Sequence, residues 1–113
     1  MKYYSEKETK DLRVALEREI LGWNHVSTKK MFGCPCYQAK GMLFVFLVTK
    51  GIVITQLQTA DRIELSNQQQ TTFFQAGKKT IKNWLKLPIE NIEELDEVIP
   101  FIRKSYREAL QKA

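Results

Sequence analysis

Apolar residues recur at helical spacing in two segments, one near each end of the chain. The first stripe consists of Leu12, Ala15, Leu16 and Ile20, with Trp23 one turn on. It follows Ser5 and Glu8, whose three-residue spacing is that of a capping box, and Gly22 suits the helix exit. The second stripe consists of Leu95, Ile99, Ile102, Tyr106 and Leu110. Both stripes predict amphipathic helices that cover an apolar partner.

Proline interrupts the second helical pattern. Pro100 has no N–H to donate and clashes with the carbonyl one turn earlier, so it is disfavoured inside a helix. We therefore expect residues 91–95 to form a separate turn. The main helix would then be capped by Asp96, with Pro100 inside its first turn.

Between the two helical segments the pattern is that of strands. Residues 42–48 are apolar throughout, which is typical of a central strand, and residues 28–33, 36–39 and 51–57 flank it. Lys40-Gly41 and Lys50-Gly51 predict tight turns with glycine at the second central position. Gly33-Cys34-Pro35 predicts a bend or break.

The following segment predicts a short helix and a further hairpin. Residues 59–67 read as a helix capped by Thr59, and residues 71–75 and 79–87 lie on either side of an Ala76-Gly77-Lys78 turn. The whole pattern predicts one α+β domain over residues 1–113. It has two layers: an antiparallel sheet of five or six strands, and an N-terminal, a short central and a C-terminal helix. The expected core consists of Leu16, Ile20, Leu43, Phe44, Val45, Phe46, Ile54, Leu95, Ile102 and Tyr106.

Two motifs resemble a known family. They are Lys29-Lys30-Met31-Phe32-Gly33 ahead of the strands, and Gly77 with Trp84 before Leu87-Pro88. In this order they are similar to the TfoX (Sxy) N-terminal domain family, and Ser105-Tyr106 resembles the related YjbR-like proteins. The resemblance implies a two-layer α+β fold around an antiparallel sheet and a role in regulation. It implies no catalytic residues.

The chain departs from the family pattern at two points. Many members have a second glycine where this chain has Cys34. Full-length TfoX proteins also have a C-terminal helical domain that this sequence lacks, so we expect a stand-alone regulatory or interaction module.

Positive charge is concentrated in the middle of the sequence. The net charge is +5, yet residues 27–86 contain nine of the eighteen basic residues and only two of the thirteen acidic ones. Such a surplus attracts phosphate backbones and other anions, although lysine is also a common solubilising residue on strands. The predicted partner-binding or nucleic-acid-binding residues are Lys29, Lys30, Lys78, Lys79, Lys82, Trp84 and Lys86.

Trp84 has two interpretations. Strand alternation would place Lys82, Trp84 and Lys86 on one face, as in a stacking platform for single-stranded nucleic acid. Alternatively, Trp84 packs under a helix or on its own sheet, and the family resemblance favours that structural role.

Cys34 and Cys36 are the remaining chemical candidates. A C-x-C pair could form a strained disulfide or supply two metal ligands, but zinc sites need at least three protein ligands. The single His25 lies in the helix-to-strand connection and reads as a loop or capping residue. We expect reduced thiols without metal. The alternative function is a small thiol-dependent or ligand-binding protein that uses Cys34 and Cys36.

No catalytic motif occurs in the sequence, so we expect a non-enzymatic domain without a cofactor. The polar segment Met1–Glu6 does not resemble a secretory signal, and no apolar run is long enough for a membrane span. Two cysteines are consistent with a cytoplasmic protein. The expected partner is a protein or nucleic acid, not a membrane, and the chain is expected to be a monomer or a homodimer.

Overall fold

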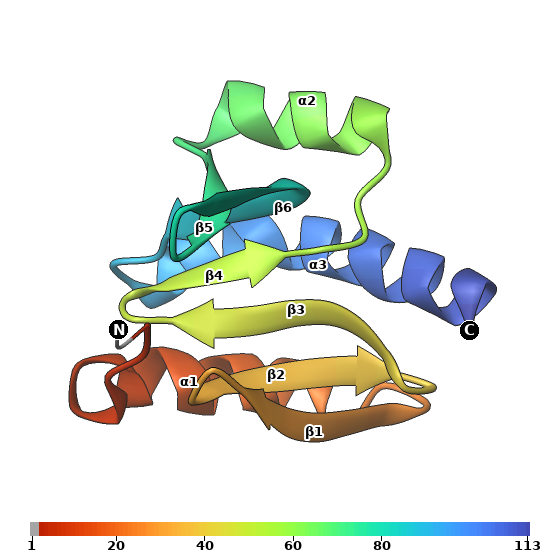
Figure 1. Cartoon of the computed structure of the whole chain (residues 1–113). Coiled ribbons are helices and arrows are strands. Elements are labelled where there is room, and N and C mark those ends of the chain that lie inside the picture. Colours follow the sequence, from red (N-terminus) through yellow and green to blue (C-terminus); the bar gives the residue numbers. More distant parts are fainter. Residues whose placement is uncertain (1–2) are drawn as a thin grey trace.

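A computed structural model describes residues 3–113, and Figure 1 shows its helices and strands. Met1 and Lys2, part of the segment that was compared with a secretory signal, lie outside the described residues. The elements are α1 (Glu6–Ile20), β1 (Val26–Met31), β2 (Cys34–Ala39), β3 (Met42–Val48), β4 (Gly51–Ile54), α2 (Thr59–Gln68), β5 (Thr72–Ala76), β6 (Lys79–Pro88) and α3 (Ile92–Lys112).

The strands form one antiparallel sheet in the order β1-β2-β3-β4-β6-β5. The predicted α+β class, with five or six antiparallel strands and three helices, is therefore confirmed. β1 and β5 are the two edge strands. Within residues 3–113, no helix is long and apolar enough to cross a bilayer.

α1 and α3 cover one face of the sheet, whereas α2 lies at the β5–β6 end (Figure 1). Nine of the ten predicted core residues are buried, and Leu43 is half-buried. Ser105 of α3 connects the layers: its hydroxyl donates to the Phe44 carbonyl at 2.7 Å and accepts from the Gln56 N–H at 3.0 Å. A bulge in β3 at this point places Phe44 beside Tyr106, with ring centroids 5.5 Å apart.

The middle of the other face of the sheet is buried without a covering helix. Phe46 on this face packs against Phe74 and Trp84 of the β5–β6 hairpin, with ring centroids 5.2 and 5.6 Å away. Phe46, Phe74 and Cys36 are all almost fully buried. Because sheets twist strongly, the edge hairpin can curl over its neighbours and form this second apolar cluster.

The C-terminal helix corrects one prediction. α3 is continuous through Pro100, and Asn91 rather than Asp96 is its N-cap, with the Asn91 side chain accepting the Glu94 N–H at 2.9 Å. Pro100 and Asp96 are both exposed. The Asp96 carbonyl that loses its helical donor therefore belongs to a residue on the solvent side, where water can hydrate it.

The N-terminal ends of the other two helices also differ from the predictions. Ser5 is the N-cap of α1, but its side chain makes no capping hydrogen bond, and its N–H donates to Thr49 Oγ1 at 2.9 Å. α2 begins at Thr59, so Gln58 rather than Thr59 is the N-cap.

Two turns also differ from the predictions. The Lys40-Gly41 turn forms as expected, but Lys50-Gly51 does not, because Gly51 is already paired with Val48 in the ladder. A Cβ on Gly51 would lie 2.7 Å from the Leu87 carbonyl oxygen, so the glycine permits close approach of β6. Cys34-Pro35 is not a bend: it begins β2, and Cys34 pairs with Met31. The strand predicted to reach residue 57 ends at Ile54.

Candidate basic surface on the sheet

Charge is separated between the two layers. The strands and the turns that join them contain eight lysines: Lys29, Lys30, Lys40, Lys50, Lys78, Lys79, Lys82 and Lys86. They contain no Asp or Glu, because residues 21–58 and 69–89 have none. Twelve of the thirteen acidic residues lie on helices, and Glu90 precedes α3. The sheet is therefore a purely cationic layer.

Two of the predicted lysines share one face and one row of the sheet. From β1 to β6, that row of cross-strand partners is Lys29, Cys36, Phe46, Val53 and Lys86. The neighbouring Tyr37 points to the opposite face, where its hydroxyl donates to Glu17 of α1 at 2.7 Å. Lys29 and Lys86 therefore lie on the face without α1 and α3, because neighbouring strand residues alternate.

Tyr3 brings two hairpin turns together. Its hydroxyl accepts the Gly77 N–H at 2.8 Å, and its ring lies 5.9 Å from that of Phe32. Lys78 and Lys79 follow Gly77 directly, while Lys29 and Lys30 precede Phe32 by two or three residues. Four of the predicted lysines therefore flank one bridge between the β1–β2 and β5–β6 turns.

Phe32 is a candidate that the sequence analysis did not single out for binding. It is 57% exposed and has a φ of 55°. Phe32 and Gly33, with a φ of 55° and 76°, form the turn between β1 and β2, and two-residue hairpin turns require this conformation. The exposed aromatic ring, not the backbone, is therefore the reason to consider Phe32 for binding. The signal in the sequence was the Phe32-Gly33 pair, one residue after Lys29-Lys30.

Trp84 is held mainly by packing. Its ring contacts Phe46 and Phe74, and the side chain is only half-buried. The predicted alternation fails because a bulge separates Ile81 from Leu85, with Asn83 at a φ of 74°. Ile81 pairs with Phe74, which contacts Trp84, so Ile81 rather than Lys82 shares the face of Trp84. The structure thus separates Lys82 from Trp84 and Lys86.

Lys30 points to the opposite side of β1 from Lys29, because neighbouring strand residues alternate. Both residues line a hollow of 820 Å³ next to α1. Here Arg13 donates to Glu6 and, at 3.0 Å, to Glu17, and Glu17 also accepts from Tyr37. Burial, and then the hydrogen bond to Glu17, raise the pKa of Tyr37. The Arg13 hydrogen bond lowers the pKa of Glu6. These side chains are hydrogen-bonded to one another, which indicates that the network has a structural role.

The cysteines are inaccessible. Cys34 and Cys36 are free thiols with 0% and 1% of their surface exposed. Burial raises the pKa of each to about 11, and for Cys36 the nearby Lys29 only partly opposes it. The thiolate is the reactive form of cysteine, so both groups are poor nucleophiles at neutral pH.

Within the part of the chain that it describes, the structure adds no further ligand to the two cysteines and no side-chain partner for His25. Across residues 3–113, no three His, Cys, Asp or Glu side chains are close enough to hold a metal ion. His25 is exposed, and its carbonyl accepts the Lys40 N–H at 3.1 Å, as expected for a loop residue.

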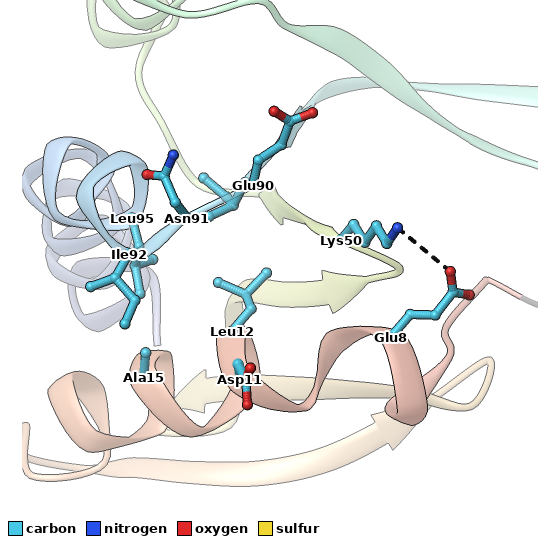
Figure 2. A pocket seen from close by; sticks show the side chains of 10 residues that line it. Glu8, Asp11, Leu12, Ala15, Lys50, Glu90, Asn91, Ile92 and Leu95 are labelled. Carbon is cyan, nitrogen blue, oxygen red and sulfur yellow. Dashed lines mark ion pairs between the residues drawn. The ribbon is translucent and has the colours of Figure 1, made fainter.

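A groove of 380 Å³ lies between α1 and the start of α3. Figure 2 shows Leu12 and Ala15 on the α1 side of it and Ile92 and Leu95 on the α3 side. Its acidic rim consists of Glu8, Asp11 and Glu90, and Lys50 pairs with Glu8 at 3.7 Å. This rim repels phosphate, so the groove is distinct from the basic surface.

No protein-family model, curated protein or solved structure matches this chain. The candidate site is therefore supported only by the positions and charges of its own residues.

Proposed function

We propose that this domain is a non-enzymatic interaction module that binds nucleic acid weakly and without sequence preference through the lysines of its sheet. The observation that supports it is the charge separation: eight lysines and no carboxylate in the strands and their turns. Among residues 3–113, none of the six predicted lysines lies within ion-pair distance of a carboxylate. Their charge is therefore available to a partner.

The spacing of the lysines favours an extended anion over a single phosphate group. Lys29 and Lys86 lie four strands apart in one row, at most about 19 Å along the sheet given a spacing of ~4.8 Å. A polymer with many phosphates can contact both ends of that row, together with Lys78 and Lys79. We therefore favour a nucleic-acid backbone as the ligand.

Such contacts determine how binding responds to salt. Lysine–phosphate contacts release counterions and contain little sequence information. Six contacts give an expected slope of log K against log salt of about −4 for single strands and about −5 for duplexes. Because Trp84 is held by packing, base stacking would come from Phe32 and would add only a modest preference for single strands.

The resemblance to the TfoX N-terminal domain motivates a regulatory role for the same module. The thiol-dependent alternative has weaker support, because burial of Cys34 and Cys36 and their raised pKa values oppose thiolate formation.

The test is titration of fluorescently labelled single- and double-stranded DNA at ~50 mM salt, where phosphate contacts are strong. Two double charge reversals remove the same charge from different layers. Lys29→Glu with Lys86→Glu changes the sheet row, whereas Lys7→Glu with Lys10→Glu changes exposed positions on α1. We expect the sheet variant to lose binding at least about tenfold more than the α1 variant.

A third variant tests the two lysines of β6. Lys82→Glu with Lys86→Glu should abolish binding if the lysines of the sheet act together, and circular dichroism should show an intact fold. Absence of DNA binding at low salt, or equal losses in the sheet and α1 variants, would favour a protein partner instead.

A further inference from the structure

The two edges of the sheet differ in how they are protected. β1 has Lys29 and Lys30 near its middle, and lysine on an edge strand is a common device against pairing with other chains. β5, with the sequence Thr72-Phe73-Phe74-Gln75-Ala76, has no charged residue and no proline. Within residues 3–113 only β6 pairs with it, so its outer edge is open.

The absence of charge extends beyond β5 itself. Leu65–Gly77 is the longest stretch of the sequence without Asp, Glu, Lys or Arg, at thirteen residues. It includes the end of α2, the connecting loop and all of β5. The uncharged edge is therefore a continuous part of the surface.

Exposed apolar side chains lie beside this edge. Phe73 of β5 is 47% exposed and Ile63 of α2 is 58% exposed. Both line a hollow of 250 Å³ together with the buried Leu85. Figure 1 places α2 beside the β5–β6 end of the sheet. The edge thus combines unpaired main chain with two exposed apolar side chains, Phe73 on β5 itself and Ile63 on the neighbouring α2.

We propose that a second copy of this chain occupies the edge, with β5 of one copy antiparallel to β5 of the other. A two-fold axis places each surface against itself, so the surface must be neutral or self-complementary. The chain has a net charge of +5, so two copies repel one another overall. Leu65–Gly77 adds no charge of its own to this repulsion.

Antiparallel pairing also accounts for the two exposed apolar residues. A strand paired with itself about a two-fold axis extends both sheets through main-chain hydrogen bonds. Phe73 lies on the face that carries α1 and α3, because its partner Leu85 pairs with Ile54 in the row of Tyr37. α2 lies beside it there, since Phe73 and Ile63 line the same hollow. In the dimer, Phe73 and Ile63 of each copy approach the same elements of the other copy and lose solvent exposure.

The test is sedimentation equilibrium of the nuclease-treated full chain over a range of concentrations and at two salt concentrations. We expect a dimer that strengthens as salt screens the repulsion between the two positive copies. This is opposite to the salt response of DNA binding, so the two proposals fail independently. A protein that stays monomeric up to ~1 mM would overturn the dimer.

Variants locate the contact. Phe73→Lys places a charge on the edge and should raise the dimer dissociation constant at least about tenfold. Gln75→Lys, at an exposed position of β5, should do the same if Phe73→Lys folds poorly. Ile92→Lys is the matched control, because Ile92 is 59% exposed but lies on α3. Equal weakening by Phe73→Lys and Ile92→Lys would contradict the proposal.

Hydrogen exchange adds a readout specific to the edge. Amides in residues 72–76 should become more protected as protein concentration rises, and Phe73→Lys should remove that gain. Concentration-dependent protection at residues 89–95 instead would place the second copy in the groove between α1 and α3 and overturn the β5 contact.

Discussion

The ion pairs of this domain all involve acids of the helices, and Lys50 is the only lysine of the sheet layer that takes part in one within residues 3–113. In the helices, acidic residues in the first turns of α1 and α3 stabilise the exposed N–H groups there. The strand lysines have no such local partner. Charge in the helical layer thus supports the fold, whereas charge in the sheet layer, apart from Lys50, forms no ion pair among residues 3–113.

Because the strands form almost no ion pairs within residues 3–113, we expect the stability of the sheet to depend on close packing. A methyl group at Gly51 should therefore lower the free energy of unfolding more than substitutions at Ser105 or Glu17 do. Gly51→Ala would place Cβ 2.7 Å from the Leu87 carbonyl and should lower the free energy of unfolding by about 3 kcal/mol, measured by urea denaturation. Gly22→Ala, at the exit of α1 with no atom within 4 Å, should be neutral or slightly stabilising. Similar losses in both variants would contradict the steric explanation.

The hydroxyl that joins the two layers should have the next largest effect. Ser105→Ala leaves the Phe44 carbonyl with the Thr55 N–H but removes the acceptor of the Gln56 N–H. We expect a loss of about 2 kcal/mol in the free energy of unfolding. Ser27→Ala on exposed β1 should change it by less than ~0.5 kcal/mol.

Buried neutral groups in β2 should make the fold sensitive to alkali. The folded pKa of Cys34 and Cys36 is about 11, above the unfolded value. Their contribution is therefore complete below the unfolded pKa and declines as pH rises through 11. At pH 10 we expect a loss of ~1 kcal/mol per thiol. Urea denaturation in reducing buffer should show this slope, and the double variant Cys34→Ala, Cys36→Ala should have a shallower one.

Charge pairs of the helical layer should matter least. Glu17→Gln removes the ion pair with Arg13, yet Glu6 still binds Arg13 and the new amide oxygen can accept from Tyr37. The expected loss is ~0.5 kcal/mol and should vanish in high salt. If Glu17→Gln lowered the free energy of unfolding as much as Ser105→Ala does, the ion pairs of the helices would contribute more to stability than we expect.

Features with a local cause could be predicted from the sequence. The stripe that ends at Ile20 predicted α1, the apolar run at residues 42–48 predicted the central strand, and the Lys40-Gly41 turn formed as expected. Of the candidate site, the lysines followed from composition. Their exposure on one cationic layer could be inferred from the absence of acid in the strands.

Features that depend on distant contacts could not be predicted. Gly51 reflects the approach of β6, thirty-six residues later, at Leu87. The bulge at Asn83 changes which residues share a face with Trp84. It accompanies the packing of the β5–β6 hairpin onto Phe46 of β3. Ser5 binds Thr49 instead of its own helix. In each case a tertiary contact outweighs the local pattern.

The Tyr3 bridge has a consequence for the order of folding. Tyr3 is separated from Gly77 by 74 residues, so the contact cannot form during synthesis until the fifth and sixth strands begin to emerge. Contacts between distant positions add loop-closure entropy and slow folding. Until that moment Phe46 lacks its cover from Phe74 and Trp84. The nascent chain is therefore expected to be most prone to aggregation just before its last hairpin is complete.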